Sequence, residues 1–280
     1  MPQRRHLRQG LGFLLAAALL LTGCGAEGST DADAPAPSPT SEPPSEATSE
    51  ATSDSTSGHE TIAERCSGST PPDATLDNLT VKGDGMTIPA VAVRPTGRPR
   101  AVAVLLPQTT GGLCGWLPYA ARLATRGVLA VSMDVCGYGA TCRGTITHRI
   151  EVQVDAVLAH VGAPDAPVTL IGASMGGSQT VRAVARGAGV DAWVDVSGLS
   201  AWDGDNLIDL APDITKPGLV VYARSDGPLE FGRARQLARA TGARFHEAPI
   251  GHGWDLVLRG SSNRPTRAGT VIEEFVLSAT

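Results

Sequence analysis

A serine between two glycines is the residue of this chain best suited to nucleophilic chemistry. Ser174 lies in Gly172-Ala-Ser174-Met-Gly176, after an apolar run over 168–171 and before a predicted helix over 178–185. In the order strand, tight turn, helix, such a pattern puts the serine on a strained turn where only small neighbours fit. The sequence therefore predicts a nucleophile elbow at Ser174. The alternative is a glycine-rich turn with an incidental serine.

A serine hydroxyl attacks a carbonyl group efficiently only when a base removes its proton and a third group orients that base. His252 is the preferred base, because it follows the last predicted strand and glycines on both sides let its ring approach another loop. It could also be a plain turn residue. The other histidines lie in the leader, in a polar tract, near the ends of a predicted helix or inside a predicted strand: His6, His59, His148, His160 and His246.

The preferred orienting acid is Asp226, at the end of the predicted strand over 219–222. Its neighbours Gly227 and Pro228 also suit an ordinary turn, which is the alternative interpretation. Asp195 and Asp203 follow the preceding predicted strand and stay open as alternative acids.

Strands and helices alternate along the part of the chain that would position these residues. An opening hairpin over 76–82 and 87–94 precedes apolar runs that are typical of strands buried on both faces. This order predicts an α/β fold with a mostly parallel sheet of about eight strands, helices on both faces, and working groups at the carboxyl ends of the strands. The predicted strands are 101–106, 128–133, 168–171, 192–196, 219–222 and 244–247, and the predicted helices are 117–126, 147–161, 178–185, 229–240 and 266–277.

Four segments in this order resemble the α/β-hydrolase family over roughly residues 70–280. They are Gly172-Ala-Ser174-Met-Gly176, Asp134-Val-Cys-Gly-Tyr-Gly139 (similar to a D-x-x-G-x-G motif of that family), Asp226, and Gly-His252-Gly. The chain order Ser, Asp, His is also that of the family. More faintly, the chain is similar to dienelactone hydrolases and acyl esterases. The resemblance implies a serine hydrolase acting on a small-molecule or acyl ester through a covalent acyl-enzyme, without a cofactor.

The resemblance also implies an oxyanion hole, formed by the backbone N–H groups of Met175 and of a residue in the loop 106–112. By position Thr109 supplies the second group, with Gln108 beside it. Pro107-Gln108 stands where the family usually has His-Gly. That departure keeps open a catalytically inactive surface binding protein with the same fold. A peptidase or an acyltransferase using the same triad is a further alternative.

A short connection over 197–218 predicts that no large cap covers the site. Gln108, Trp116, Trp202 and Trp254 are expected in loops around the substrate pocket. The tryptophans could equally be core or rim residues.

The first sixty residues predict export and anchoring. Residues 1–23 combine three arginines with an eleven-residue apolar stretch, which is typical of a signal peptide and too short to span a bilayer. Leu21-Thr-Gly-Cys24 resembles a bacterial lipobox, so Cys24 is expected to carry the lipid that holds the protein on the outer face of the cell membrane. Residues 24–60 are predicted to be a disordered stalk and residues 61–280 the folded domain.

Charge and short motifs exclude several other functions. The net charge is −5, but residues 61–280 hold twenty acids and twenty bases, so the acidity lies in the stalk. No basic patch or nucleic-acid motif is present, which argues against a nucleic-acid partner. No Rossmann, P-loop or H-E-x-x-H motif implies a nucleotide or zinc.

The cysteines predict two disulfides. Without Cys24, four remain in an exported chain, and three pairings are open. We favour Cys136–Cys142, which joins two ends of one loop, and then Cys66–Cys114. A metal site is the alternative, but no His-Cys spacing supports it.

Overall fold

The structure is a computed structural model that describes residues 61–71, 74–162, 165–260 and 264–278. The chain divides into two units, Met1–Thr56 and Ser57–Thr280, and the description below concerns the second. The predicted signal peptide, Cys24 and the stalk lie outside the described residues and stay predictions. Among the residues that are described, no helix is long and apolar enough to cross a membrane.

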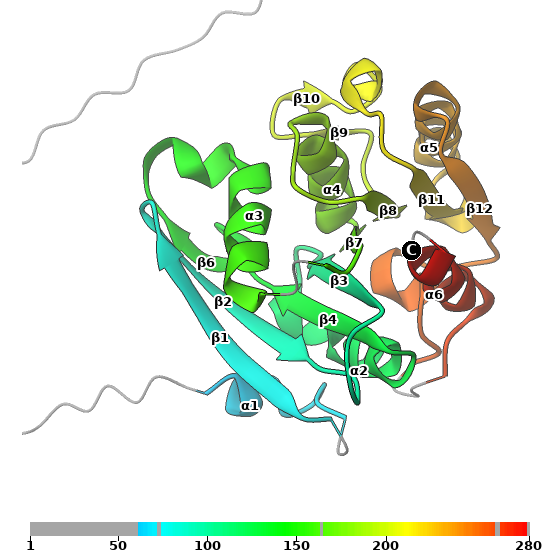
Figure 1. The fold of residues 1–280 in the computed structure, drawn as a ribbon. Coiled ribbons are helices and arrows are strands. Elements are labelled where there is room, and N and C mark those ends of the chain that lie inside the picture. The colour runs from blue at the N-terminus through cyan, green and yellow to red at the C-terminus, as the bar shows by residue number, and fades with distance from the viewer. Residues whose placement is uncertain (1–60, 72–73, 163–164, 261–263, 279–280) are drawn as a thin grey trace, which may run out of the picture. The chain divides into compact units, whose positions relative to one another are not determined.

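A ten-stranded sheet forms the centre of the described domain (Figure 1). Its order is β12-β11-β8-β7-β3-β4-β2-β6-β5, with β1 paired to β2. Six consecutive strands from β12 to β4 are parallel, and β1 and β2 form the antiparallel opening hairpin. The predicted fold class is confirmed. Eight strands are longer than four residues, as predicted, and the short β5 and β6 bring the total in the sheet to ten. The strands are β1 Leu76–Gly83, β2 Met86–Val93, β3 Ala101–Leu106, β4 Val128–Met133, β5 Val135–Cys136, β6 Gly139–Cys142, β7 Val168–Ala173, β8 Ala192–Val196, β11 Gly218–Ala223 and β12 Arg244–Ala248.

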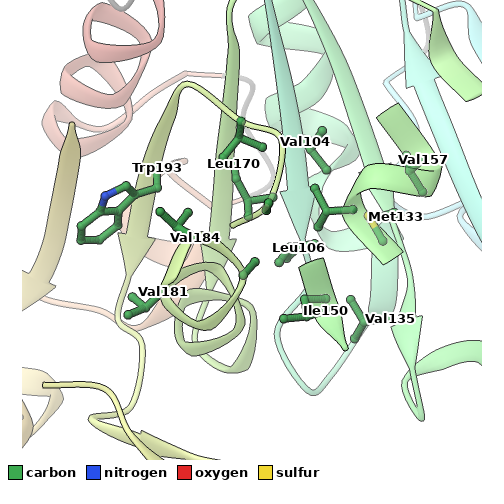
Figure 2. Close-up of a cluster of buried hydrophobic side chains, with 14 of the residues drawn as sticks. Val104, Leu106, Met133, Val135, Ile150, Val157, Leu170, Val181, Val184 and Trp193 are labelled. Atoms are coloured by element: carbon green, nitrogen blue, oxygen red, sulfur yellow. The ribbon is translucent and has the colours of Figure 1, made fainter. Parts of the chain in front are cut away.

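Helices cover both faces of the sheet, as the continuous apolar runs require. One face packs against α3 Ile150–Val161, α4 Met175–Ala185 and α5 Pro228–Thr241, and the other against α2 Leu117–Thr125 and α6 Arg267–Ser278. Side chains of β3 alternate between these layers, with Val104 and Leu106 facing the first and Leu105 the second. Figure 2 shows the first layer, where apolar side chains of α3 and α4 meet those of the sheet. A short helix, α1 Ile62–Arg65, opens the domain.

The connection between β8 and β11 contains a two-stranded hairpin in place of a cap domain. Its strands are β9 Ala201–Trp202 and β10 Asp205–Asn206. Asp203 and Gly204 form the turn with φ of 51° and 85°, which is the geometry of a two-residue hairpin loop. Short 3-10 helices complete the described fold: η1 Gly112–Trp116, η2 Gly144–His148, η3 Ala211–Asp213, η4 Arg224–Asp226 and η5 Gly253–Leu256.

Candidate active site

Ser174 lies on a strained turn between β7 and α4, as its sequence context predicts. Its φ is 51° and its ψ −115°, a region that costs a non-glycine residue about 1–3 kcal/mol. A Cβ atom on Gly172 would lie 1.9 Å from the carbonyl oxygen of Gly176, and one on Gly176 would lie 2.4 Å from that of Leu106. Both glycines are therefore required by the close approach of backbone to backbone. The Ser174 amide donates to the carbonyl oxygen of Val196 at 2.8 Å, which fixes the turn to β8.

A histidine and an aspartate meet at the ends of two neighbouring strands. Asp226 follows β11 and His252 follows β12, and the Nδ1 atom of His252 lies 2.7 Å from Oδ2 of Asp226. A hydrogen bond at Nδ1 orients the ring and leaves Nε2 available to another group. The amide of Gly251 donates to the Ser225 hydroxyl at 3.3 Å, so a second contact holds the two loops together.

The loop of His252 packs against the serine turn. A Cβ atom on Gly253 would lie 3.7 Å from the Cβ of Ala173 and 2.2 Å from Oε1 of Gln108. The residue after the histidine thus adjoins the residue before Ser174, with the Gln108 carboxamide next to it. Gln108 Nε2 donates to the Thr110 hydroxyl at 3.2 Å, and its Oε1 is buried without a hydrogen-bond partner among the described residues. Gln108, which we expected to line the pocket, has its carboxamide against Gly253 of the His252 loop, and its role in the pocket stays a prediction.

The first turn of α4 lies beside the loop after β3. The first N–H groups of a helix have no acceptor within the helix, and here Met175 is the first helical residue after Ser174. The close approach of Leu106 and Pro107 to Gly176 brings the loop 106–112 against this turn. Thr109 lies in the exposed part of that loop. The oxyanion roles of Met175 and Thr109 stay predictions.

The three tryptophans occupy different environments. Trp116 is fully buried and its indole N–H donates to the carbonyl oxygen of Leu106 at 2.7 Å, so it is a core residue, which is the alternative that the sequence left open. Trp254 is half-buried two residues after His252, and its ring lies edge-on to Trp116 and against Gly115. Trp202 is half-buried in β9, with its ring centroid 6.4 Å from that of Tyr138.

Neither alternative acid is seen to pair with His252. Asp195 is 1% exposed, and its Oδ1 accepts the Gly198 N–H at 2.7 Å. Burial raises the pKa of Asp195 to about 7, against a smaller lowering by that hydrogen bond. Asp203 accepts one hydrogen bond from Arg182 and lies 3.0 Å from the Nδ1 of His148. Asp226 is therefore the acid that the structure brings to His252.

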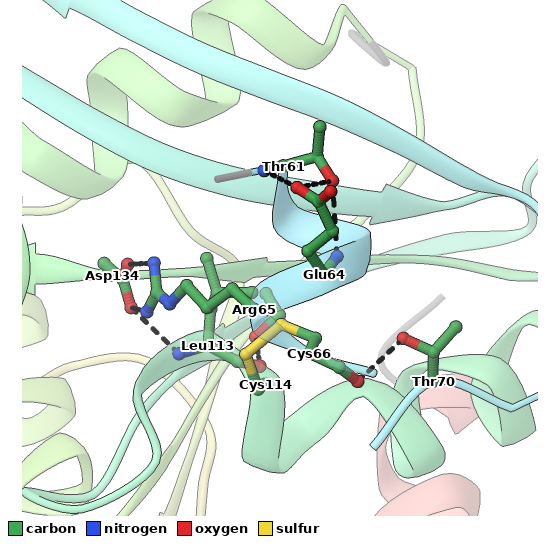
Figure 3. Close-up of a disulfide and its surroundings, with 9 residues drawn as sticks. Thr61, Glu64, Arg65, Cys66, Thr70, Leu113, Cys114 and Asp134 are labelled. Atoms are coloured by element: carbon green, nitrogen blue, oxygen red, sulfur yellow. Dashed lines mark hydrogen bonds and ion pairs between the residues drawn. A yellow bond between two sulfur atoms is a disulfide. The ribbon is translucent and has the colours of Figure 1, made fainter. Parts of the chain in front are cut away.

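Asp134, the first residue of the D-x-x-G-x-G segment, has a structural role. Its buried carboxylate accepts two hydrogen bonds from Arg65, at 2.7 and 3.0 Å, and one from the Leu113 amide at 2.9 Å (Figure 3). A Cβ atom on Gly139 would lie 2.4 Å from its Cγ, so this glycine leaves room for the carboxylate. Asp134 thereby joins α1, η1 and the loop after β4. Sequence reasoning missed Arg65, which is 69 residues away from its partner.

The favoured disulfide pairing is confirmed. Cys66 is bonded to Cys114, which links the residue after α1 to η1 next to the Arg65–Asp134 ion pair (Figure 3). Cys136 is bonded to Cys142, which closes the loop that contains β5 and β6. In the described part of the chain, no group of three or more His, Cys, Asp or Glu residues is arranged to hold a metal ion.

A cavity of about 810 Å³ lies beside Trp254 and Arg65, but none of Ser174, His252 and Asp226 lines it. The location of the candidate active site therefore follows from the contacts among its side chains and loops, and this cavity is not part of it.

No protein-family model matches the sequence, and no curated protein matches it. Solved structures do. A predicted CIB-like hydrolase from Thermoplasma acidophilum is 17% identical with a TM-score of 0.59, over 73% of this chain and 99% of that one. A protein named as a dienelactone hydrolase from Klebsiella pneumoniae is 18% identical with a TM-score of 0.54, over 73% and 98%. The esterase Pf2001 from Pyrococcus furiosus is 12% identical with a TM-score of 0.55, over 73% and 90%. The chain has the α/β-hydrolase fold.

Proposed function

We propose that this protein is a serine hydrolase that cleaves an ester-like acyl bond in a small-molecule substrate. The observation that carries the proposal is the His252–Asp226 hydrogen bond of 2.7 Å on a loop that packs against the strained turn of Ser174. A nucleophile, a base and an orienting acid on three separate loops are what acyl transfer needs. The fold of esterases and other hydrolases supports the same conclusion.

In the proposed reaction the Ser174 hydroxyl oxygen attacks the carbonyl carbon of the ester, and its proton passes to Nε2 of His252. Asp226 holds the imidazole by its Nδ1 and stabilises the positive charge that the ring acquires. The tetrahedral oxyanion accepts hydrogen bonds from the Met175 and Thr109 amides, each worth about 3–4 kcal/mol in the transition state. The alcohol leaves with the proton from His252. Water, deprotonated by the same ring, then releases the acid and restores the Ser174 hydroxyl.

Replacing the nucleophile tests the proposal. Ser174→Ala should abolish turnover of short p-nitrophenyl esters and labelling by a fluorophosphonate probe, because both need the serine oxygen. Ser178→Ala is the matched control: this buried hydroxyl, one helical turn further on, donates to the Leu199 carbonyl. It should keep labelling and turnover. Full turnover by a folded Ser174→Ala variant would refute the proposal.

The base and the acid need separate tests. His252→Gln should abolish turnover, whereas Asp226→Asn should lower kcat on the order of 10⁴-fold, since the ring loses its preferred tautomer. His160→Gln, an exposed histidine on α3, is the control and should retain activity. Equal activity of Asp226→Asn and the unmodified protein would remove Asp226 from the proposed triad.

We further propose that Cys24 anchors the domain to the outer face of the cell membrane. Metabolic labelling with a palmitate analogue should mark the protein, and Cys24→Ser should release it from the membrane fraction. A protein that is unlabelled and still sediments with membranes would contradict this assignment.

A further inference from the structure

The most exposed large apolar side chains of the described residues share one edge of the sheet. Tyr138 follows β5, Leu199 follows β8, Leu229 is the second residue of α5 after β11, and Ile250 follows β12; their exposed fractions are 36%, 37%, 64% and 73%. The carboxyl ends of the parallel strands meet at this edge, and the candidate triad lies there too. Apolar side chains scattered over a surface are ordinary, but a set gathered around a reaction centre points to an apolar ligand.

Two hydrogen bonds and one contact between aromatic rings join these loops into a continuous series. The amide of Gly251, beside Ile250, donates to Ser225 in the Asp226 loop. The amide of Ser200, beside Leu199, donates to Glu230 in the first turn of α5 at 2.8 Å. The rings of Tyr138 and Trp202 then connect the β5–β6 loop to β9, with centroids 6.4 Å apart and planes at 49°. The apolar side chains thus belong to adjoining loops.

Tyr138 is held by a covalently closed loop. The Cys136–Cys142 disulfide joins β5 to β6, and Tyr138 lies between them. Its amide donates to the carbonyl oxygen of Val135 at 2.8 Å. A ring that is more than a third exposed is therefore presented by a loop with little freedom to move.

Trp202 is held by a buried arginine. Arg182 of α4 is 1% exposed and donates to Asp203 in the hairpin turn at 2.8 Å and to Asp205 just after the turn at 2.7 Å. A two-stranded hairpin of this length has no stability of its own, so the ion pairs are what fix it to α4. Burying a guanidinium group is costly, and the hairpin it fixes carries Trp202.

The two aromatic loops come from opposite sides of the strand ends that carry Ser174 and the predicted oxyanion loop. Tyr138 follows β4 and β5, Trp202 follows β8, and between β4 and β8 the sheet contains only β3 and β7. Those two strands end at the predicted oxyanion loop and at Ser174. Trp202 packs on the sheet face of α3 and α4. The ring pair therefore spans the sheet edge on that face, next to the strand ends that carry the chemistry.

We propose that Tyr138 and Trp202 form a preformed aromatic wall that binds a bulky apolar group, aromatic or branched, of the ester substrate. This rests on the proposed function of the site and adds a substrate class to it. Preformed rings bind an apolar group with little loss of side-chain entropy, which favours such substrates over short acyl esters.

The kinetic test compares two p-nitrophenyl esters, the 3-phenylpropanoate and the acetate, on the full chain. The ratio of their kcat/KM values should fall about three- to tenfold in Trp202→Ala and in Tyr138→Ala. Trp202→Phe should restore most of it. Phe245→Ala is the matched control, because this half-buried ring packs on Phe231 near the other end of β12. An unchanged ratio in both alanine variants overturns the proposal while leaving the hydrolase assignment intact.

A binding test does not depend on turnover. In the Ser174→Ala background, 4-phenylbutan-2-one should bind more tightly than butan-2-one, and Trp202→Ala should remove that difference. Equal binding of the two ketones before the second substitution overturns the proposal. If no ester is hydrolysed but the ketone preference depends on Trp202, the wall stands and the hydrolase assignment fails.

The role of the disulfide can be measured with the same esters. Cys136→Ser/Cys142→Ser should lower the phenylpropanoate-to-acetate ratio in the same direction as Tyr138→Ala, with both variants folded by circular dichroism. A ratio equal to that of the unmodified protein would show that the wall is not preformed by this loop, which contradicts the proposal.

Discussion

Asp195 is a buried carboxyl group that makes the stability of the domain depend on pH. It lies at the end of β8, 1% exposed, with one hydrogen bond from the Gly198 amide. Burial raises its pKa from 3.8 to about 7. The folded protein therefore binds this proton more tightly than the unfolded chain does. The contribution of this proton to the free energy of unfolding is fully present below pH 3.8 and is lost as the pH rises to about 7.

The size of the effect follows from the two pKa values. Their difference corresponds to about 4 kcal/mol once the group is ionised in both states. Between pH 5 and pH 8 the part that is lost amounts to about 3 kcal/mol. Asp195→Asn removes the ionisation but keeps an oxygen that can accept the Gly198 N–H. Between these pH values the free energy of unfolding should therefore fall by about 3 kcal/mol less in the variant than in the unmodified protein.

Urea unfolding at pH 5, 6, 7 and 8, with both disulfides intact, measures the difference. His246, whose pKa is lowered by burial and by Arg267 and Arg244, has the opposite slope in both proteins and cancels in the comparison. Asp191→Asn is the matched control, since it removes an exposed carboxylate that also accepts one backbone N–H. Identical pH dependence of Asp195→Asn and the unmodified protein would refute the reasoning.

Further substitutions test the supports of the site. Gly115→Ala would put a Cβ atom 2.2 Å from the Trp254 ring, so we expect the free energy of unfolding to fall by about 1–3 kcal/mol, measured by thermal unfolding. We also expect a lower kcat, because Trp254 follows His252 by two residues. Unchanged values of both would contradict the packing of Trp254 on Gly115. Replacing a disulfide by two serines should cost about 4 kcal/mol for Cys66–Cys114 and about 2 kcal/mol for Cys136–Cys142, because the closed segments span 48 and 6 residues; urea midpoints in the reverse order would contradict this expectation.

The features that depend on neighbouring residues in the chain could be predicted from the sequence. Strands over 101–106, 128–133 and 192–196 have the bounds predicted from their mostly apolar residues, because both faces of the sheet are covered. The turn at Ser174 was predictable because close backbone contacts on both sides exclude larger residues than glycine. The choice of Asp226 over the other acids rested on the resemblance to a family, and here it is the one hydrogen-bonded to His252.

Other features depend on contacts between distant residues. Arg65 pairs with Asp134, 69 residues further along the chain, and no local sequence pattern predicts this pairing. The start of α1 could have been found, because Thr61 and Glu64 form a capping box. The β9–β10 hairpin has the turn residues Asp203-Gly204, but its strands of two residues are too short to show alternation. The burial of Trp116 could not be predicted from the sequence, because an indole ring fits a hydrophobic core and a pocket wall equally well.

The joint between α1 and η1 has a mechanical consequence. The Arg65–Asp134 ion pair and the Cys66–Cys114 bond attach the chain to the domain ten residues before β1 begins. Tension applied to residue 61 from its N-terminal side passes through a covalent link into η1, so the hairpin of β1 and β2 bears no load. The covalent link would therefore have to break before a pull on residue 61 could peel β1 from the sheet.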